Sequence, residues 1–250
     1  MRLIITDSHD KMGQVTAQYL LGLMYSHPNR INIAITSGAT PTTVYEHLIP
    51  DVKDKNYLNH VHYYNFDEIQ YQTRQEDEGA TLSNLRRLFF TPAKIEEERI
   101  HTINHKNYKD QDRKIAVDGG LDLMLMGIGA DGHFCYNLPH TTTFDDATSK
   151  VLINTEELVE KVKGDFGMPD DIPEFYVTMG PRSVMSAKRL VVIANGEHKA
   201  GIIKELIEGK VDFNNPSSIL KLHPNLTVIV DKEAASKLSK DYGNGFNEFL

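Results

Sequence analysis

A glycine-rich segment holds the residue types best suited to proton transfer. It reads Gly-Ile-Gly-Ala-Asp-Gly-His over residues 127–133 and follows an apolar run. Asp131 and His133 are two residues apart, so a hydrogen bond between them would orient the imidazole and stabilise its charged form. The glycines allow sharp turns and a close approach of the backbone to a ligand. A purely structural Asp–His pair is the alternative, and the third glycine falls too early for a dinucleotide fingerprint.

Two adjacent carboxylates, Asp67 and Glu68, stand at the end of another apolar run, in the sequence Asn-Phe-Asp-Glu at 65–68. Successive side chains of an extended chain point to opposite faces. One carboxylate is therefore expected to face a cleft while the other makes a structural contact. A carboxylate in a partly dry cleft has a raised pKa, which suits a general base. A solvated acidic turn is an equally good interpretation of these residues alone.

A third polar segment, Thr-Ser-Gly-Ala-Thr-Pro-Thr-Thr at 36–43, lies between an expected strand and an expected helix. Gly38 allows a tight turn, and the first N–H groups of a helix have no internal partners. Together with the helix dipole, these features predict a phosphate-binding loop. The alternative is a well-capped helix without a ligand. The segment is not a Walker motif, because the Gly-Lys-Ser/Thr ending is absent.

These segments follow short apolar runs that alternate with helical patterns. Strands are expected at 3–6, 31–36, 61–66, 121–127, 175–179, 190–194 and 226–230. Helices are expected at 12–25, 41–48, 82–90, 199–208 and 232–238. The alternation predicts a single domain over 1–250 with an α/β fold: a doubly wound, mostly parallel, Rossmann-like sheet with helices on both faces. Ligands of such sheets bind beyond the carboxyl ends of the strands, where all three polar segments would lie.

Composition excludes several classes of protein. A net charge of −8 without a basic cluster argues against a nucleic-acid partner. The single cysteine, Cys135, allows no internal disulfide and fits a reducing compartment. The sequence start lacks the pattern of a signal peptide, and no apolar run is long enough to span a bilayer. We therefore expect a soluble, cytoplasmic protein. The polar segment 141–173 is expected to be a mobile lid or a long surface excursion.

The motifs resemble those of a known family. The segment 127–133, followed by Asn137 and Pro139, resembles the signature of the glucosamine-6-phosphate deaminase/isomerase family, and the related 6-phosphogluconolactonases share its core. The segments 37–43 and 65–68 resemble the phosphate loop and the Asp-Glu motif of that family. Gly196 and Lys199 resemble a later Gly-x-x-Lys segment, and Leu-His-Pro at 222–224 resembles a segment near the last strand. The matches are collinear and cover nearly the whole chain.

The resemblance implies roles for individual residues. Asp67 would move a proton between C2 and C1 of an open-chain sugar, and His133, held by Asp131, would assist ring opening. The residues that would hold the phosphate are Ser37, Gly38, Ala39, Thr40 and Lys199. The residues that would line the rest of the substrate pocket are Glu68, Gly129, Asn137 and Leu138. The chemistry implied requires no metal and no cofactor. Oligomers occur in the family, so the resemblance leaves open whether this chain forms a homo-oligomer.

The chain departs from the family pattern at two places. The deaminases have glutamate between Asn and Pro where this chain has Leu138, and they use a phosphate-binding arginine beyond this motif. Lys150, Lys161 and Lys163 are the candidates to substitute for that arginine, without its planar fork. The lactonases also lack the glutamate, but they favour an arginine where this chain has Ile69.

Three functions follow as hypotheses. The first is an aldose–ketose isomerase or deaminase acting on an amino-sugar 6-phosphate. The second is a 6-phosphogluconolactonase-like hydrolase, in which His133 would activate water. The third is a non-catalytic sugar-phosphate sensor, suggested by Leu138. Of the other residues, Cys135 is interpreted as a packed thiol and His198 as a surface residue, while Tyr136 is a candidate for the pocket wall.

Overall fold

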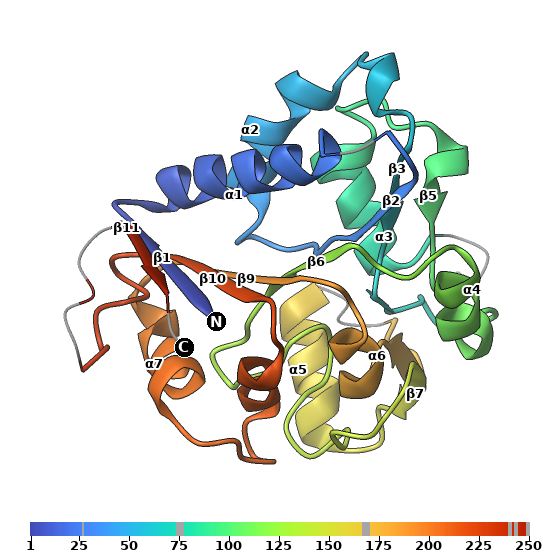
Figure 1. Cartoon of the computed structure of the whole chain (residues 1–250). Helices are drawn as coiled ribbons and strands as arrows, with labels where there is room; N and C mark the ends of the chain where they lie inside the picture. Colours follow the sequence, from blue (N-terminus) through green and yellow to red (C-terminus); the bar gives the residue numbers. More distant parts are fainter. Residues whose placement is uncertain (27, 74–77, 167–170, 240–241, 243–244, 249–250) are drawn as a thin grey trace.

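A twisted, mostly parallel sheet forms the centre of the molecule (Figure 1). The computed structural model describes residues 1–26, 28–73, 78–166, 171–239, 242 and 245–248. Within these ranges, the sheet has eight strands in the order β11-β1-β10-β9-β6-β2-β3-β5. All neighbouring strands are parallel except β11, which is antiparallel to β1. The strands are β1 Arg2–Thr6, β2 Ile31–Ala34, β3 Val61–Tyr64, β5 Ile100–His101, β6 Leu123–Gly127, β9 Leu190–Ala194, β10 Leu226–Asp231 and β11 Gly245–Glu248.

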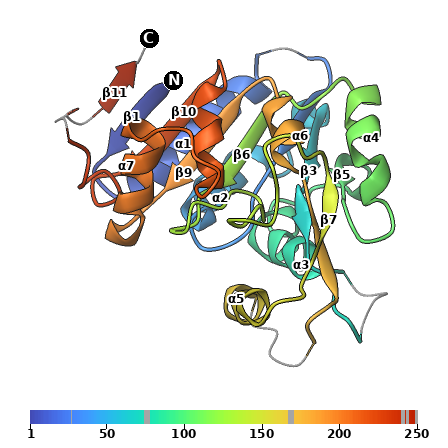
Figure 2. The same ribbon diagram turned by 90° about the horizontal axis from the view of Figure 1, so that it is seen from below.

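Helices cover both faces of this sheet (Figure 2). One face is covered by α1 His9–Met24, α2 Thr42–Val52 and α3 Ala80–Leu85, and the other by α4 Gln111–Val117, α6 Pro181–Met185 and α7 Ala200–Glu208. Successive strand residues alternate between the two faces. Ile33 accordingly packs in the core with α1 and α2, whereas Ala34 packs in the opposite core. No helix in the described part of the chain combines the length and apolarity needed to cross a lipid bilayer.

A smaller antiparallel sheet stands beside the main one, with its strands in the order β4-β8-β7. These strands are β4 Asp67–Glu68, β7 Ser149–Leu152 and β8 Phe175–Thr178. Helix α5, Glu156–Phe166, packs against this sheet through a third apolar cluster that includes Val162 and Tyr176. Short helical segments complete the structure: η1 Asn56–Leu58, η2 Arg86–Phe90 (a π-helix), η3 Glu97–Arg99, η4 Tyr108–Asp110, η5 Glu197–Lys199 and η6 Pro216–Leu222.

The predicted doubly wound α/β fold is confirmed, with local corrections. The strand expected at 175–179 belongs to the small antiparallel sheet as β8. The helix expected at 232–238 is wrong: this stretch consists of successive turns, and Asp231 accepts the N–H of Ala234 at its start. The segment 141–173, expected to be a mobile lid or a long surface excursion, contains β7 and α5. The strands β5-β3-β2-β6-β9-β10 follow the 3-2-1-4-5-6 order of classic doubly wound sheets, and β1 and β11 extend the sheet at the edge beside β10.

The strand order places a switch point between β6 and β2, which are neighbours in the sheet. From β2 the chain continues outward to β3, whereas from β6 it eventually enters β9 on the other side. Loops that leave adjacent strands in opposite directions open a crevice at the carboxyl ends. The segments 36–41 and 128–133 are these two loops.

Candidate active site

A cavity of about 670 Å³ lies at this crevice. Its wall is contributed by the segments that follow four neighbouring strands, β9, β6, β2 and β3, and by parts of α3 and α5. Lys199 follows β9 and His133 follows β6, while the 36–41 loop follows β2 and Asp67 follows β3. Residues as distant in the chain as Ser37 and Lys199 are therefore brought to one site by the order of the strands.

The 36–41 loop forms one wall of the cavity, with Ser37, Gly38, Ala39 and Thr40 all in the lining. Gly38 has φ = 100°, a left-handed conformation that favours glycine. Helix α2 follows directly and begins at Thr42, one residue later than expected. Its N-terminus receives no hydrogen bond from the side chain of the N-cap. The loop and this helix start thus present backbone donors of the kind that bind a phosphate.

The two carboxylates of the Asp-Glu pair point to different environments. Asp67 lines the cavity and accepts a hydrogen bond of 3.1 Å from the Thr81 hydroxyl. Glu68 is outside this cavity and accepts the backbone N–H groups of Ile69, Thr81 and Leu82 at 2.8–3.0 Å. Glu68 therefore holds the first turn of α3 and is not placed to contact a ligand in the cavity. Thr81 joins the two roles, since its N–H binds Glu68 while its hydroxyl binds Asp67.

Asp67 has the electrostatics of a general base. Burial raises its pKa to about 6, against the opposing effects of the Thr81 hydrogen bond and the charge of His133. A carboxylate with this pKa is ionised at neutral pH and still takes up a proton readily. A positive charge on His133, which lines the same cavity, favours the ionised form of Asp67 and so lowers its pKa.

The loop after β6 holds His133 by its Nδ1 atom. Asp131 Oδ1 lies 2.6 Å from this nitrogen and also accepts the His133 backbone N–H at 3.2 Å. Burial alone would raise the pKa of Asp131, but its hydrogen bonds and ion pairing with His133 hold that pKa well below its ordinary value. Asp131 is therefore ionised, which fixes a proton on Nδ1 and leaves Nε2 as the ring atom that can exchange a proton with a ligand.

Close packing explains a glycine in this loop. A side chain at Gly129 would overlap the Asp131 carboxylate and the His133 ring. The Gly129 N–H also donates to the His133 carbonyl oxygen at 2.7 Å, which tightens the turn. Gly129 thus lets the backbone approach the Asp131–His133 pair that lies over it.

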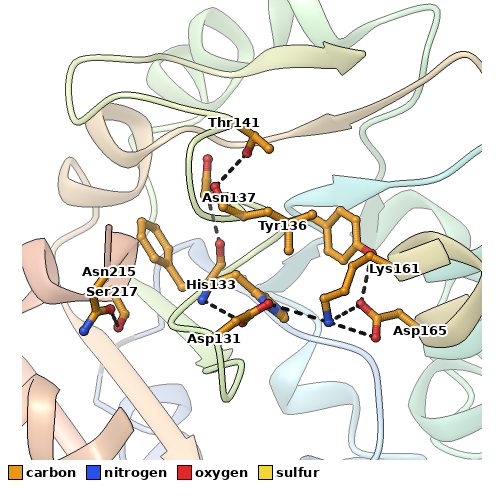
Figure 3. Close-up of polar contacts among 11 residues, drawn as sticks. Asp131, His133, Tyr136, Asn137, Thr141, Lys161, Asp165, Asn215 and Ser217 are labelled. Atoms are coloured by element: carbon orange, nitrogen blue, oxygen red, sulfur yellow. Dashed lines mark hydrogen bonds and ion pairs between the residues drawn. The ribbon is translucent and has the colours of Figure 1, made fainter. Parts of the chain in front are cut away.

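Two lysines bring positive charge to the site (Figure 3 shows the contacts of Lys161). Lys161 of α5 lies 2.9 Å from Asp165 and 3.7 Å from Asp131. Asp165 also accepts a 3.0 Å hydrogen bond from the Tyr136 hydroxyl. Lys199 ends η5 and lines the cavity; burial lowers its pKa, and the nearby charge of Lys161 acts in the same direction.

Three further residues singled out from the sequence lie outside the cavity lining. Asn137 is fully buried and donates to the carbonyl oxygens of Phe134 and Met179, so it ties the loop to the end of β8. Leu138 packs in the apolar cluster beneath α5, which accounts for an apolar residue at this position. Asp131 acts on the cavity through His133, since its own side chain lines a neighbouring cavity of about 610 Å³.

Several lining residues were not anticipated. Those that carry polar groups are Tyr71, Ser83, Asn84, Arg87, Asp165 and His198. Ser83, Asn84 and Arg87 recur at helical spacing in the stretch expected to be a helix at 82–90, a polar face that the sequence does display. His198 was interpreted as a surface residue; it is exposed, and it also lines the cavity. Cys135 is buried in the wall, where burial raises the pKa of its thiol. Within the described ranges, no three His, Cys, Asp or Glu side chains converge as a metal site.

Comparison with known proteins agrees with this architecture. The model of the family "Glucosamine-6-phosphate isomerases/6-phosphogluconolactonase" matches residues 8–229. A glucosamine-6-phosphate deaminase of Clostridium botulinum is 31% identical over 96% of this chain and 99% of its own length. One from Thermoanaerobacter pseudethanolicus is 30% identical over 94% of both chains.

Solved structures of both branches of this family share the fold. A monomeric glucosamine-6-phosphate deaminase superimposes with a TM-score of 0.80 at 24% identity, covering 94% of this chain and 99% of that one. The 6-phosphogluconolactonase from Trypanosoma brucei has a TM-score of 0.69 at 15% identity, covering 95% and 98% respectively. The resemblance of the sequence motifs is thereby confirmed, and the chain belongs to the glucosamine-6-phosphate isomerase/6-phosphogluconolactonase family.

Proposed function

We propose that the protein is an aldose–ketose isomerase that deaminates an amino-sugar 6-phosphate, with glucosamine 6-phosphate as the first substrate to test. The observation that carries the proposal is the position of Asp67 and His133 in one cavity beside the 36–41 loop. A base of raised pKa and a tethered histidine are the groups that ring opening and carbon-to-carbon proton transfer require. The curated relatives that match at about 30% identity bear the name of this activity.

The reaction would use these groups in sequence. The 36–41 loop and Lys199 bind the phosphate, and His133 Nε2 moves a proton between the anomeric hydroxyl and the ring oxygen as the ring opens. Asp67 then takes the proton from C2 and returns it to C1. The imine left at C2 reacts with water, ammonia leaves, and a ketose 6-phosphate is formed. The protons balance without a redox cofactor, because the hydrogen removed from C2 is returned to C1.

Leu138 supports a second candidate, a lactonase. Its side chain is buried in the cluster beneath α5, so this position supplies no carboxylate to His133. In this alternative, His133 Nε2 takes a proton from water, which attacks the carbonyl carbon of a phosphorylated sugar lactone. The ester bond between that carbon and the ring oxygen then breaks, and Nε2 returns the proton to the departing oxygen. Asp67 would then have no obligatory role in transfer between carbon atoms.

Product analysis separates the two candidates. Purified protein is incubated with glucosamine 6-phosphate and, separately, with 6-phosphogluconolactone, and ammonia, ketose and acid are measured. Deaminase activity predicts ammonia and ketose in equal amounts, abolished by Asp67→Asn and retained by the surface control Asp110→Asn. Hydrolysis of the lactone that survives Asp67→Asn would favour the lactonase. Binding of a sugar phosphate without either product would contradict both catalytic assignments and favour a sensor.

A further inference from the structure

Arg87 is a cation of the cavity wall to which the proposed mechanism assigns no role. It lies in the π-helical turn Arg86–Phe90 that directly continues α3, and its side chain is exposed. The guanidinium of Arg87 makes no hydrogen bond or ion pair with another residue of the described ranges. Turns of π-helix inside an α-helix occur frequently at functional sites. A guanidinium with no such partner among the described residues is available to a ligand.

The neighbouring arginine has a different role. Arg86 is ion-paired with Glu78 at 2.5 Å and bound by Glu97 through two nitrogens at 2.5 and 2.9 Å. Successive helical residues point in different directions, so Arg86 is held by acidic partners whereas Arg87 faces the cavity. The chain therefore offers a matched pair of arginines, one structural and one open to the site.

The helix that carries Arg87 lies directly against the 36–41 loop. Asn84 Oδ1 accepts a hydrogen bond of 3.3 Å from the Gly38 N–H, one of the donors expected to bind phosphate. Asn84 is three residues before Arg87, so their side chains leave the helix on the same face. The Gly38 N–H thus points toward this face, and an anion bound to it would lie between the loop and the helix.

The other cations of the cavity are less available to that position. Lys161 is ion-paired with Asp165 and lies near Asp131, while Lys199 is partly buried. We propose that Arg87 binds the phosphate group of the substrate together with Lys199 and the 36–41 loop. Its planar guanidinium can bind two phosphate oxygens at once, which a lysine cannot do. The inference rests on the proposed function, because it concerns the sugar phosphate of the same cavity.

Binding measurements on four forms of the full chain test this assignment: the wild type, Arg87→Ala, Arg87→Lys and Arg86→Ala. Isothermal titration uses glucosamine 6-phosphate, inorganic phosphate and unphosphorylated glucosamine as probes, with Asp67→Asn added to every form in the 6-phosphate titrations so that the heat reports binding and not turnover. Arg87→Ala should weaken binding of the two phosphate-bearing probes by about 10- to 100-fold and leave glucosamine unchanged. Arg87→Lys should fall between Arg87→Ala and the wild type. Arg86→Ala should bind all three probes like the wild type.

Two results would overturn the role of Arg87 alone. One is wild-type affinity of Arg87→Ala for both phosphate-bearing probes. The other is an equal loss for glucosamine and its 6-phosphate, which would indicate a general disturbance of the cavity. Thermal unfolding checks each variant, and Arg87→Lys supplies the comparison should the alanine variant fail to fold. Absence of sugar-phosphate binding by the wild type would instead overturn the proposed function, and this inference with it.

Discussion

Asp131 and His133 form a charge-assisted hydrogen bond, with a carboxylate oxygen 2.6 Å from Nδ1 of the ring. The same oxygen accepts the backbone N–H of His133, so the carboxylate restrains both the ring and its main chain. The bond distinguishes the two ring nitrogens, because Nδ1 is held by Asp131 while Nε2 is the atom to which the proposed reaction assigns proton exchange.

Asp131→Asn should therefore reduce turnover strongly. The amide can donate to Nδ1 and stabilise the wrong tautomer, and it no longer offsets the charge of a protonated imidazole. We expect kcat to fall by about 10²- to 10⁴-fold with a much smaller change in KM. Steady-state kinetics test this, and a loss confined to KM would show that Asp131 serves binding and not proton transfer.

The raised pKa of Asp67 predicts a pH-dependent rate. A base must be ionised to accept a proton, so kcat/KM should decline as the pH falls through about 6. The acidic limb of the pH profile should report this value. A profile that stays flat down to pH 5 would exclude Asp67 as the group that limits the rate in acid.

The same shift predicts that Asp67 lowers stability at neutral pH. Its pKa of about 6 in the folded state is above the ordinary 3.8, so the folded state favours the protonated carboxyl. The stability gained from this preference is fully present below about pH 4 and is lost as the pH rises through 6. The difference between these two pKa values corresponds to about 3 kcal/mol in the free energy of unfolding. Asp67→Asn should thus be inactive, yet have at pH 8 a free energy of unfolding at least equal to that of the wild type. Urea unfolding at pH 5 and pH 8 measures this; a variant that is clearly less stable at both values would contradict it.

Gly129→Ala tests the close packing beneath Asp131 and His133. The added methyl group would overlap the Asp131 carboxylate and the His133 ring and displace both. We expect a loss of activity of about 100-fold, since small misplacements of reacting groups cost this much. The control is Gly22→Ala on α1, where no atom beyond the neighbouring residues and the backbone of the helix itself lies within 4 Å of the added methyl group. Activity assays and circular dichroism on both variants give the answer, and a fully active Gly129→Ala would refute the packing argument.

Leu138→Glu places the deaminase-type carboxylate into this chain. Leu138 is 3% exposed and packs with Val162 and Tyr176, so the new carboxylate would be buried among apolar side chains. We expect a loss of about 2–5 kcal/mol in the free energy of unfolding. Leu138→Met, which preserves volume and polarity, should cost less than about 1.5 kcal/mol. Urea unfolding compares the two variants; equal stability would mean that the introduced carboxylate escapes the apolar cluster and reaches the cavity.

The different roles of Asp67 and Glu68 depend on both the local chain and the tertiary packing. Alternation along an extended chain indicated that one carboxylate faces a cleft and the other makes a structural contact. Only the position of α3, whose first turn meets Glu68, decided which of the two does which. The leucine at 138 similarly departed from a motif in the sequence, but its packing partner Val162 comes from a helix that the sequence did not reveal.

The sequence by itself indicated most strands of the main sheet and the functional groups of the loops, because strand patterns, glycines and adjacent functional groups are local features. It indicated the buried parallel strands, the 36–41 loop and the Asp131–His133 pair. Only the tertiary structure decided that β2 and β6 are neighbours, which opens the cavity between their loops. It also brought Arg87 and Lys161 to the site and placed β8 in a second sheet. These features depend on packing between segments distant in the chain, for which no local pattern carries a signal.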